Sequence, residues 1–169
     1  MKPFTFIVLI SLTSVLSGCT SYPRILNFPF DAAGRSLNSF ASELTPQVSS
    51  RFIVFTSDRN GSQDVYLYDA QNRQLVNTPG LNSLDEIASH PAISEDGRYI
   101  VFEASRQGRT GIFLYDRQTQ QKRNLTASLP AQVRNPTISA DGTTIAFEVA
   151  KDGQWDLMVY NRSGQQISP

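Results

Sequence analysis

One stretch of this 169-residue chain decides the fold, and it reads His90-Pro91-Ala92-Ile93-Ser94-Glu95-Asp96-Gly97. Related phrases stand 45 residues before and after it, at Thr45-Pro46-Gln47-Val48-Ser49 and Asn135-Pro136-Thr137-Ile138-Ser139. An apolar run follows each phrase, and a second run that ends in Tyr-Asp or Tyr-Asn closes each unit. The first runs are residues 51–55, 98–102 and 144–147, and the closing runs are residues 65–69, 112–116 and 157–161. The chain therefore contains one structural unit three times.

Each unit divides into four short strands. In the second unit we expect strands at residues 92–94, 99–104, 111–116 and 122–126. Runs of this length, bounded by Gly, Pro and Asp, are too short for buried helices. A period in the mid-forties with several strands per unit is typical of propeller blades. We therefore predict an all-β fold, a partial β-propeller of three four-stranded blades, over residues 45–169.

A tight hairpin turn is predicted between the first two strands of the second and third units. Asp96-Gly97 and Asp141-Gly142 stand at equivalent points, and Asp-Gly favours tight turns because Gly accepts a positive φ. In the first unit this turn shrinks to Ser50. We expect these glycines to be structural residues.

The repeats resemble those of the TolB-like (WD40-like) β-propeller family. The phrase 90–97 and the phrase Phe55-Thr56-Ser57-Asp58-Arg59-Asn60-Gly61 carry the resemblance, which extends over residues 45–169. In that family a propeller takes part in the Tol–Pal system of the bacterial envelope. The resemblance implies a periplasmic protein that binds other macromolecules. Related blades also occur in peptidase propellers, and TolB has six blades where this chain has three.

Three blades cannot complete a ring, because propellers have four to eight. The outer faces of the first and last blades are therefore expected to need covering. A two-fold homodimer would complete a six-bladed ring. Alternatively, the chain is an open arc in which residues 20–44 shield one face. The periodicity supports both arrangements equally.

The N-terminus has the features of an export signal. Lys2 precedes an apolar stretch at residues 4–16, and Leu16-Ser17-Gly18-Cys19 follows. These four residues resemble the lipobox of bacterial lipoproteins, which implies a signal peptide at 1–18 and a lipid on Cys19. Residues 19–44 then form the lipidated N-terminus and tether. Thr20 is not the Asp that retains some lipoproteins at the inner membrane, which favours the outer membrane.

Composition argues against several kinds of function. The formal net charge is zero, so no basic excess favours nucleic-acid binding. The chain has one Cys and one His, too few for a disulfide or a Cys/His zinc site. The sequence contains no Gly-x-Ser-x-Gly motif or phosphate-binding loop. We expect no enzyme activity, no metal and no cofactor, and we interpret His90 as a structural residue of its repeat.

Loops between the second and third strands of every unit should emerge on one face. That face gathers Arg and Trp, which are typical anchors of protein interfaces. The candidate partner-binding residues are Arg59, Arg106, Arg109, Lys151 and Trp155. The sequence thus predicts a lipid-anchored envelope protein that binds another protein. The alternatives are a propeller that binds a small ligand or glycan, and the accessory propeller of a peptidase.

Overall fold

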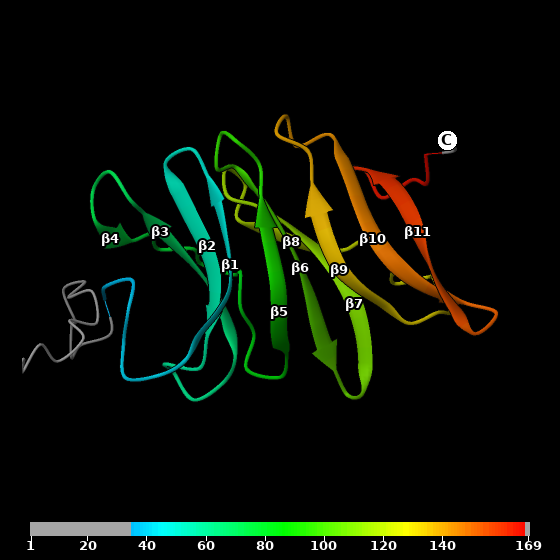
Figure 1. The fold of residues 1–169 in the computed structure, drawn as a ribbon, viewed down its shortest axis with the longest axis horizontal. Helices are drawn as coiled ribbons and strands as arrows, with labels where there is room; N and C mark the ends of the chain where they lie inside the picture. Colours follow the sequence, from blue (N-terminus) through cyan, green and yellow to red (C-terminus); the bar gives the residue numbers. More distant parts are fainter. Residues whose placement is uncertain (1–34, 168–169) are drawn as a thin grey trace, which may run out of the picture.

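The three repeats fold into three antiparallel β-sheets that follow one another in a row (Figure 1). This computed structural model describes residues 35–167, which form eleven strands. The strands are β1 (Glu43–Ser49), β2 (Phe52–Ser57), β3 (Asp64–Asp69), β4 (Gln74–Leu75), β5 (Ile87–Ile93), β6 (Tyr99–Arg106), β7 (Arg109–Asp116), β8 (Gln121–Asn124), β9 (Val133–Ile138), β10 (Thr144–Lys151) and β11 (Gln154–Asn161). We refer to β1–β4, β5–β8 and β9–β11 as blades 1, 2 and 3.

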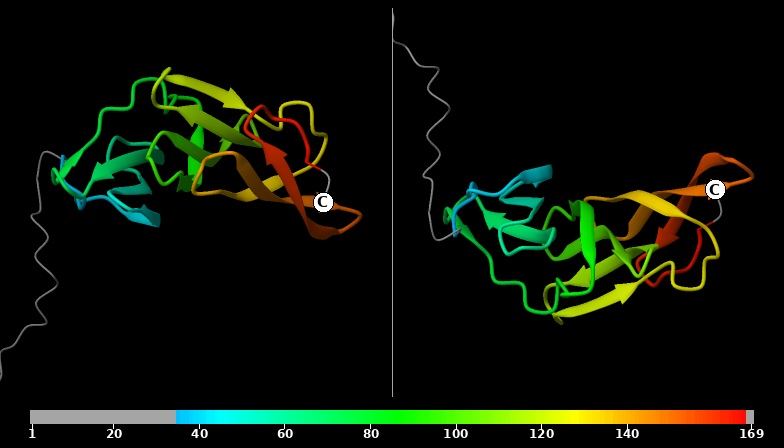
Figure 2. Two further views of the ribbon diagram at one scale, coloured as in Figure 1. Left: turned by 90° about the horizontal axis from the view of Figure 1, so that it is seen from above. Right: turned by 90° about the horizontal axis from the view of Figure 1, so that it is seen from below.

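Sheet topology confirms the predicted partial propeller. Blades 1 and 2 each have four strands in chain order, which is the meander of a propeller blade. Blade 3 has three strands, and a bridge between Tyr160 and Gln166 stands where its fourth strand would pair. The first strands β1, β5 and β9 are neighbours along one edge of the row (Figures 1 and 2).

Every first strand contains a β-bulge at the residue before the repeated proline. Thr45, His90 and Asn135 have positive φ values of 48°, 46° and 52°, and the pairing register shifts at each of them. The bulge lets the strand continue on both sides, so β5 begins at Ile87 rather than at the predicted residue 92. Asn and His tolerate this conformation better than most residues. The positive φ at this position, as well as the need for a polar side chain, therefore explains why His90 stands there.

The predicted Asp-Gly hairpins are correct in position but differ in type. Gly97 and Gly142 have φ values of 70°, whereas Asp96 and Asp141 do not have positive φ. The Asp96 carboxylate instead accepts hydrogen bonds from Ser94 Oγ at 2.6 Å and from the Arg98 N–H at 2.9 Å. These turns are longer than two residues, and the aspartate closes them through its side chain.

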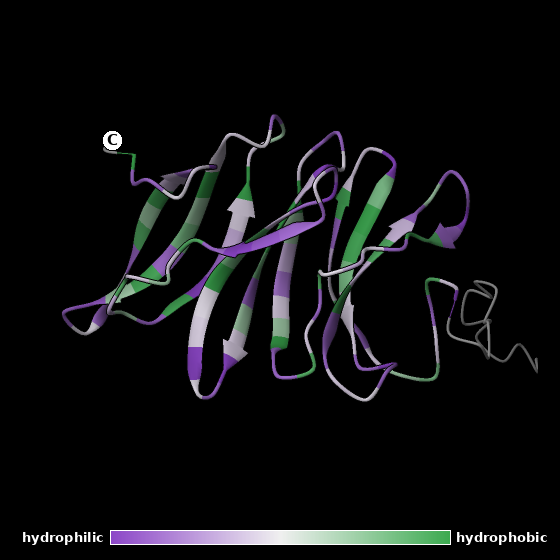
Figure 3. Ribbon diagram, turned by 180° about the vertical axis from the view of Figure 1, so that it is seen from behind, coloured by the Kyte–Doolittle hydropathy of each residue, from purple (hydrophilic) through white to green (hydrophobic). Residues whose placement is uncertain are grey.

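Two apolar clusters join the blades. One lies between blades 1 and 2 and includes the fully buried Val54, Val65 and Ile100. The other lies between blades 2 and 3 and includes Val101 and Ile145. Apolar residues recur along the strands of all three blades (Figure 3), as expected for sheets covered on both faces.

A second set of contacts, which we call the clamp, surrounds one aromatic ring at each junction between neighbouring blades. Phe52 lies against Gly97 of the next blade and beneath Arg117, whose guanidinium carbon is 4.8 Å from the ring centroid. At the second junction Tyr99 lies against Gly142 and beneath Arg162 at 4.5 Å. Each clamp thus joins an aromatic residue of one blade to a turn glycine and an arginine of the following blade.

The outer face of blade 1 is covered by the preceding segment, residues 35–42, together with Glu43. Arg59 connects the two, because its guanidinium donates to the carbonyl oxygens of Ser36 and Leu37, both at 2.9 Å, and pairs with Glu43 at 2.8 Å. The same guanidinium lies over the Phe55 and Tyr66 rings. Phe55 is consequently 1% exposed although it lies on the outer face of the first described blade.

Candidate functional site

One end of the row carries the loops between the second and third strands of each blade. Two of these loops are two-residue turns, because Arg106 pairs with Arg109 and Lys151 pairs with Gln154. The intervening residues, Gln107-Gly108 and Asp152-Gly153, all have positive φ, as a type I′ turn requires. These short turns hold the flanking side chains on rigid hairpin ends.

A hollow of about 930 Å³ opens at this end, between blades 2 and 3. Arg106 and Arg109 from the β6–β7 hairpin form one wall, and Leu129 and Pro130 from the connection to blade 3 form another. Phe113, Arg134, Trp155 and further polar residues complete the lining. The hollow therefore combines cationic, aromatic and aliphatic surfaces in one place.

The two carboxylates of the hollow, Glu86 and Glu103, are both held by hydrogen bonds within the protein. Glu86 accepts from Lys122 Nζ at 2.5 Å, and both side chains are largely buried. Glu103 accepts from Ser89 Oγ at 3.0 Å and from the Asn135 N–H at 3.1 Å. Glu86 is therefore paired with a cation, whereas the Ser89 and Asn135 donors to Glu103 are uncharged and do not offset its charge.

The guanidinium groups of Arg106 and Arg109 take little part in ion pairs within the protein. Arg106 pairs with Asp85 at 2.5 Å, but both side chains are more than half exposed, so the pair contributes little to stability. Arg109 is exposed and forms no ion pair with any carboxylate of residues 35–167. The hollow thus offers positive charge to a partner.

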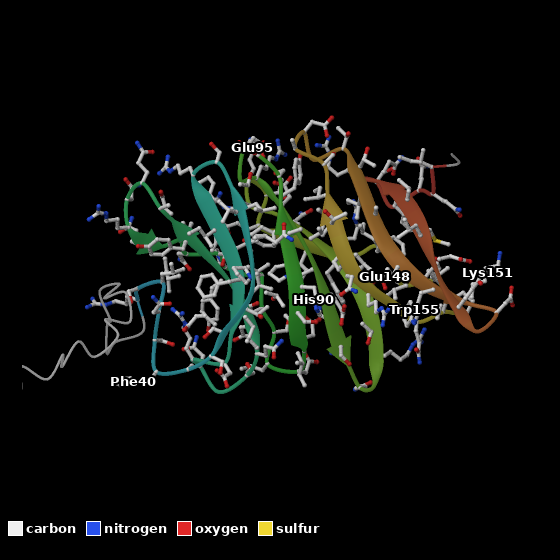
Figure 4. All side chains as sticks on the ribbon, viewed as in Figure 1. Phe40, His90, Glu95, Glu148, Lys151 and Trp155 are labelled. Atoms are coloured by element: carbon white, nitrogen blue, oxygen red, sulfur yellow. The ribbon has the colours of Figure 1, made fainter. Side chains whose placement is uncertain are left out.

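Trp155, which Figure 4 labels on blade 3, forms the third wall of the hollow together with Arg134. The Arg134 guanidinium carbon lies 3.8 Å from the centroid of the indole, and its Nε donates to Glu148 at 2.6 Å. A hydrogen bond from Asn135 and the adjacent Arg134 lower the pKa of Glu148, so its carboxylate is ionised at neutral pH. The three side chains are therefore fixed before any partner arrives.

The predicted site residues do not all lie together. Arg106, Arg109 and Trp155 come together in the hollow, whereas Lys151 lies exposed near the tip of blade 3 (Figure 4). Arg59 does not join them, because it packs on the outer face of blade 1. Cys19 lies outside the described residues.

Arg134 is a residue of the hollow that sequence reasoning missed. It directly precedes the repeated Asn135-Pro136, and a basic residue there, beside the glutamate of the neighbouring strand, was the available signal.

Chemically, the hollow offers arginine, tryptophan and aliphatic side chains for binding. His90 lies in its bulge, where Nδ1 is 3.6 Å from Glu103. No group of three His, Cys, Asp or Glu side chains within residues 35–167 is placed to hold a metal ion. In the same part of the chain, no helix is long and apolar enough to cross a membrane.

Comparison with known proteins bears on the fold alone. No protein-family model matches the sequence, and no curated protein matches it. Among solved structures, TolB from Acinetobacter baumannii is similar over 77% of this chain and 32% of its own, with 22% identity and a TM-score of 0.58. The β-propeller domain of the Trilobed protease from Pyrococcus furiosus is similar over 76% of this chain and 42% of its own, with 15% identity and a TM-score of 0.57.

A puromycin-hydrolyzing peptidase from Mycobacterium tuberculosis is also similar, over 75% of this chain and 20% of its own, at 18% identity and a TM-score of 0.55. The chain spans less than half the length of each of these proteins. Its structural neighbours are thus TolB-like β-propeller proteins, including the propellers of peptidases.

Proposed function

We propose that this protein is a non-catalytic envelope protein, anchored by a lipid on Cys19, whose hollow binds a protein partner. The observation that carries the binding role is the hollow itself. It joins the exposed Arg109 to the prearranged Trp155 and Arg134 in a concave site of about 930 Å³. Arginine and tryptophan in a recess are typical of the central anchors of protein interfaces.

The N-terminal sequence and the fold both support the proposed location. A lipobox-like Leu16-Ser17-Gly18-Cys19 supports attachment on the periplasmic side, and Thr20 favours the outer membrane. Structural likeness to TolB supports a partner from the Tol–Pal system or a related envelope assembly. Peptidoglycan-associated lipoproteins are therefore the first candidates.

A pull-down from bacterial envelopes tests this function. The full-length protein is used as bait, and peptidoglycan-associated lipoproteins are sought by immunoblot. Arg109→Gln should lower recovery of the partner at least several-fold, because it removes the positive charge that no carboxylate of residues 35–167 pairs with. Arg73→Gln is the matched control, since Arg73 lies in the turn between β3 and β4 at the opposite end of the blade. Equal recovery with wild type and Arg109→Gln would contradict the proposed site.

The rival function is an accessory propeller of a peptidase, which the likeness to two peptidase propellers favours. It predicts that a peptidase co-purifies and that its substrate range changes when this protein is removed. A small ligand or glycan in the hollow predicts instead that sugars or peptidoglycan fragments protect the Trp155 fluorescence from quenching.

A further inference from the structure

The outer edge of β11 is paired along only part of its length. β11 is the last strand of its sheet, at the C-terminal end of the row (Figure 1). The carbonyl oxygen of Val159 accepts a hydrogen bond from the Ile167 N–H at 2.8 Å, so its backbone groups face away from β10. Backbone groups alternate sides along an antiparallel strand, so those of Trp155 and Leu157 also face away from β10. Within residues 35–167, no hydrogen bond reaches these outward groups of Trp155 or Leu157.

The position of Leu157 is filled by a hydrogen-bonding partner in the other two blades. It lies four residues before the end of each third strand, at Val65 in blade 1 and at Ile112 in blade 2. The Ile112 carbonyl oxygen accepts from the N–H of residue 125 at 2.8 Å, and the Ile112 N–H donates to Thr126 Oγ1 at 3.0 Å. Both backbone groups of Val65 bond to the side-chain amide of Asn82, at 2.9 and 2.8 Å. The open groups of β11 are therefore an exception within the repeat.

The remaining edges of the three sheets are protected against pairing with another chain. The first strands β1, β5 and β9 each contain a bulge and a proline, at Pro46, Pro91 and Pro136. The outer strands β4 and β8 have only 2 and 4 residues, and β8 carries Lys122 and Arg123. Bulges, prolines, charges and short length all keep edge strands from pairing. Residues 155–159 of β11 read Trp-Asp-Leu-Met-Val, without a proline or a bulge, so this edge is open to a further strand.

We propose that an extended segment of the protein partner pairs with residues 155–159 as an antiparallel fourth strand and completes blade 3. The orientation follows from β4 and β8, which are antiparallel to β3 and β7. When a peptide adds to an open sheet edge, hydrogen bonds between the main chains supply affinity. The inference rests on the proposed function, because Trp155 belongs both to this edge and to the lining of the hollow. A partner seated in the hollow therefore lies beside the open edge.

Blade 2 indicates which residues the added segment should carry. Leu125, which bonds to the Ile112 carbonyl, is 7% exposed and belongs to the apolar cluster between blades 2 and 3. The added segment should therefore place an aliphatic residue opposite Leu157, which is 78% exposed without it. A threonine, serine or asparagine should follow, to accept from the Leu157 N–H as Thr126 accepts from Ile112. Proline is excluded at the aliphatic position, because its N–H is needed.

Two substitutions at position 157 separate backbone pairing from side-chain contact. Leu157→Ala removes the side chain and keeps the N–H, whereas Leu157→Pro removes both. The N–H points away from β10, and an edge strand tolerates proline there, so the melting temperatures of the two variants should be similar. In the pull-down described above, Leu157→Pro should recover at least about tenfold less partner than Leu157→Ala. Equal recovery with the two variants, whether high or low, overturns the proposal.

Amide hydrogen exchange tests the edge without relying on the fold of the proline variant. The probe is a synthetic peptide of residues 124–129, Asn-Leu-Thr-Ala-Ser-Leu, added to the full-length protein in mild detergent. The Leu157 N–H should exchange at least about threefold more slowly as the peptide rises to about 10 millimolar. The Met158 N–H, which points toward β10, should be slow throughout. The same peptide with proline in place of its first leucine is the control and should protect nothing. An exchange rate of Leu157 that the first peptide leaves unchanged overturns the proposal.

The results also separate this inference from the proposed function. If Arg109→Gln lowers recovery but the two Leu157 variants recover equally, the hollow binds its partner without an added strand, and only this inference fails. If no partner is recovered but the peptide protects the Leu157 N–H, the strand pairing stands and the proposed function fails. Sedimentation equilibrium at about 100 micromolar reveals the other occupant. A dimer that Leu157→Pro abolishes would assign the edge to a second copy and overturn the pairing with a partner.

Discussion

The turn glycine Gly97 lies directly against the ring of Phe52 in the preceding blade, and a Cβ built at position 97 would come within 2.3 Å of that ring. Real Cβ atoms do not approach other atoms so closely, so the ring occupies space that glycine alone leaves open. The turn and the blade junction therefore depend on the same residue.

Gly97→Ala should destabilise the protein by about 2–4 kcal/mol. Roughly 1 kcal/mol comes from the positive φ, and overpacking against Phe52 adds ~1–3 kcal/mol. Gly108→Ala is the matched control, because Gly108 also has a positive φ of 77° but has nothing within 4 Å of the added Cβ. Urea unfolding of both variants measures the difference. If the two losses were equal, the contact with Phe52 would not matter.

Arg59→Ala should reveal the internal role of this arginine. Its side chain is 4% exposed and pairs with Glu43, so truncation removes the cation beside this carboxylate and one donor to each of two carbonyl groups. We expect a loss of about 2–4 kcal/mol. Arg106→Ala, which removes an exposed pair with Asp85, should cost less than about 1 kcal/mol. Thermal unfolding of the two variants is the measurement, and similar melting temperatures would contradict the cover on blade 1.

Stability should fall in acid through two equivalent ion pairs. Arg51 Nε donates to Asp69 at 2.8 Å, and Arg98 pairs with Asp116 at 2.8 Å. These arginines lower the pKa of both carboxyl groups, and backbone N–H groups assist. A carboxyl with a lowered folded-state pKa stabilises above its ordinary pKa of about 3.9, and that contribution is lost as pH falls.

Urea unfolding between pH 7 and pH 2 tests this pH dependence. The unfolding free energy of the wild type should decline below about pH 4. The Asp69→Asn, Asp116→Asn double variant should be less stable at pH 7 and should decline less steeply. Blade 3 offers an internal comparison, because Thr143 and Asn161 replace the pair there. Parallel pH profiles of wild type and variant would show that other groups control acid unfolding.

Cys19→Ser should prevent lipid attachment. The expected result is an unprocessed precursor or a protein released from membranes, measured by metabolic labelling with a radioactive fatty acid and by membrane fractionation. Thr20→Ser is the control, since it leaves the thiol in place. A Cys19→Ser protein that matures normally and remains membrane-bound would place the anchor at another residue.

Local repetition allowed the architecture to be predicted, because the three phrases at Pro46, Pro91 and Pro136 have the same register and the same length between them. Backbone detail was less accessible. Nothing in the identities of Thr45, His90 and Asn135 signals a shared positive φ until their equivalence is recognised in the sheet. The two-residue type I′ turn at Gln107-Gly108 likewise lacks the usual Asn-Gly or Asp-Gly signature.

The candidate site depended on packing between distant residues, and prediction succeeded there in part. Arg106, Arg109 and Trp155 were placed at one end because alternating strands must put their loops together. Arg59 followed the same rule in sequence but folds back over the rings of Phe55 and Tyr66, which face outward from the first described blade. The repeat pattern does not reveal this difference, because it arises only where a blade has a neighbour on one side alone.

The clamp has a direction, because every ring is held by groups that come later in the chain. Phe52 is contacted by Gly97 and Arg117, and Tyr99 is contacted by Gly142 and Arg162, all of which follow these rings in the sequence. No described residue holds blade 3 in this way. Amide hydrogen exchange should therefore be graded along the row, with β11 opening first and the strands between the two apolar clusters opening last. The polypeptide would therefore fray first from its C-terminal blade.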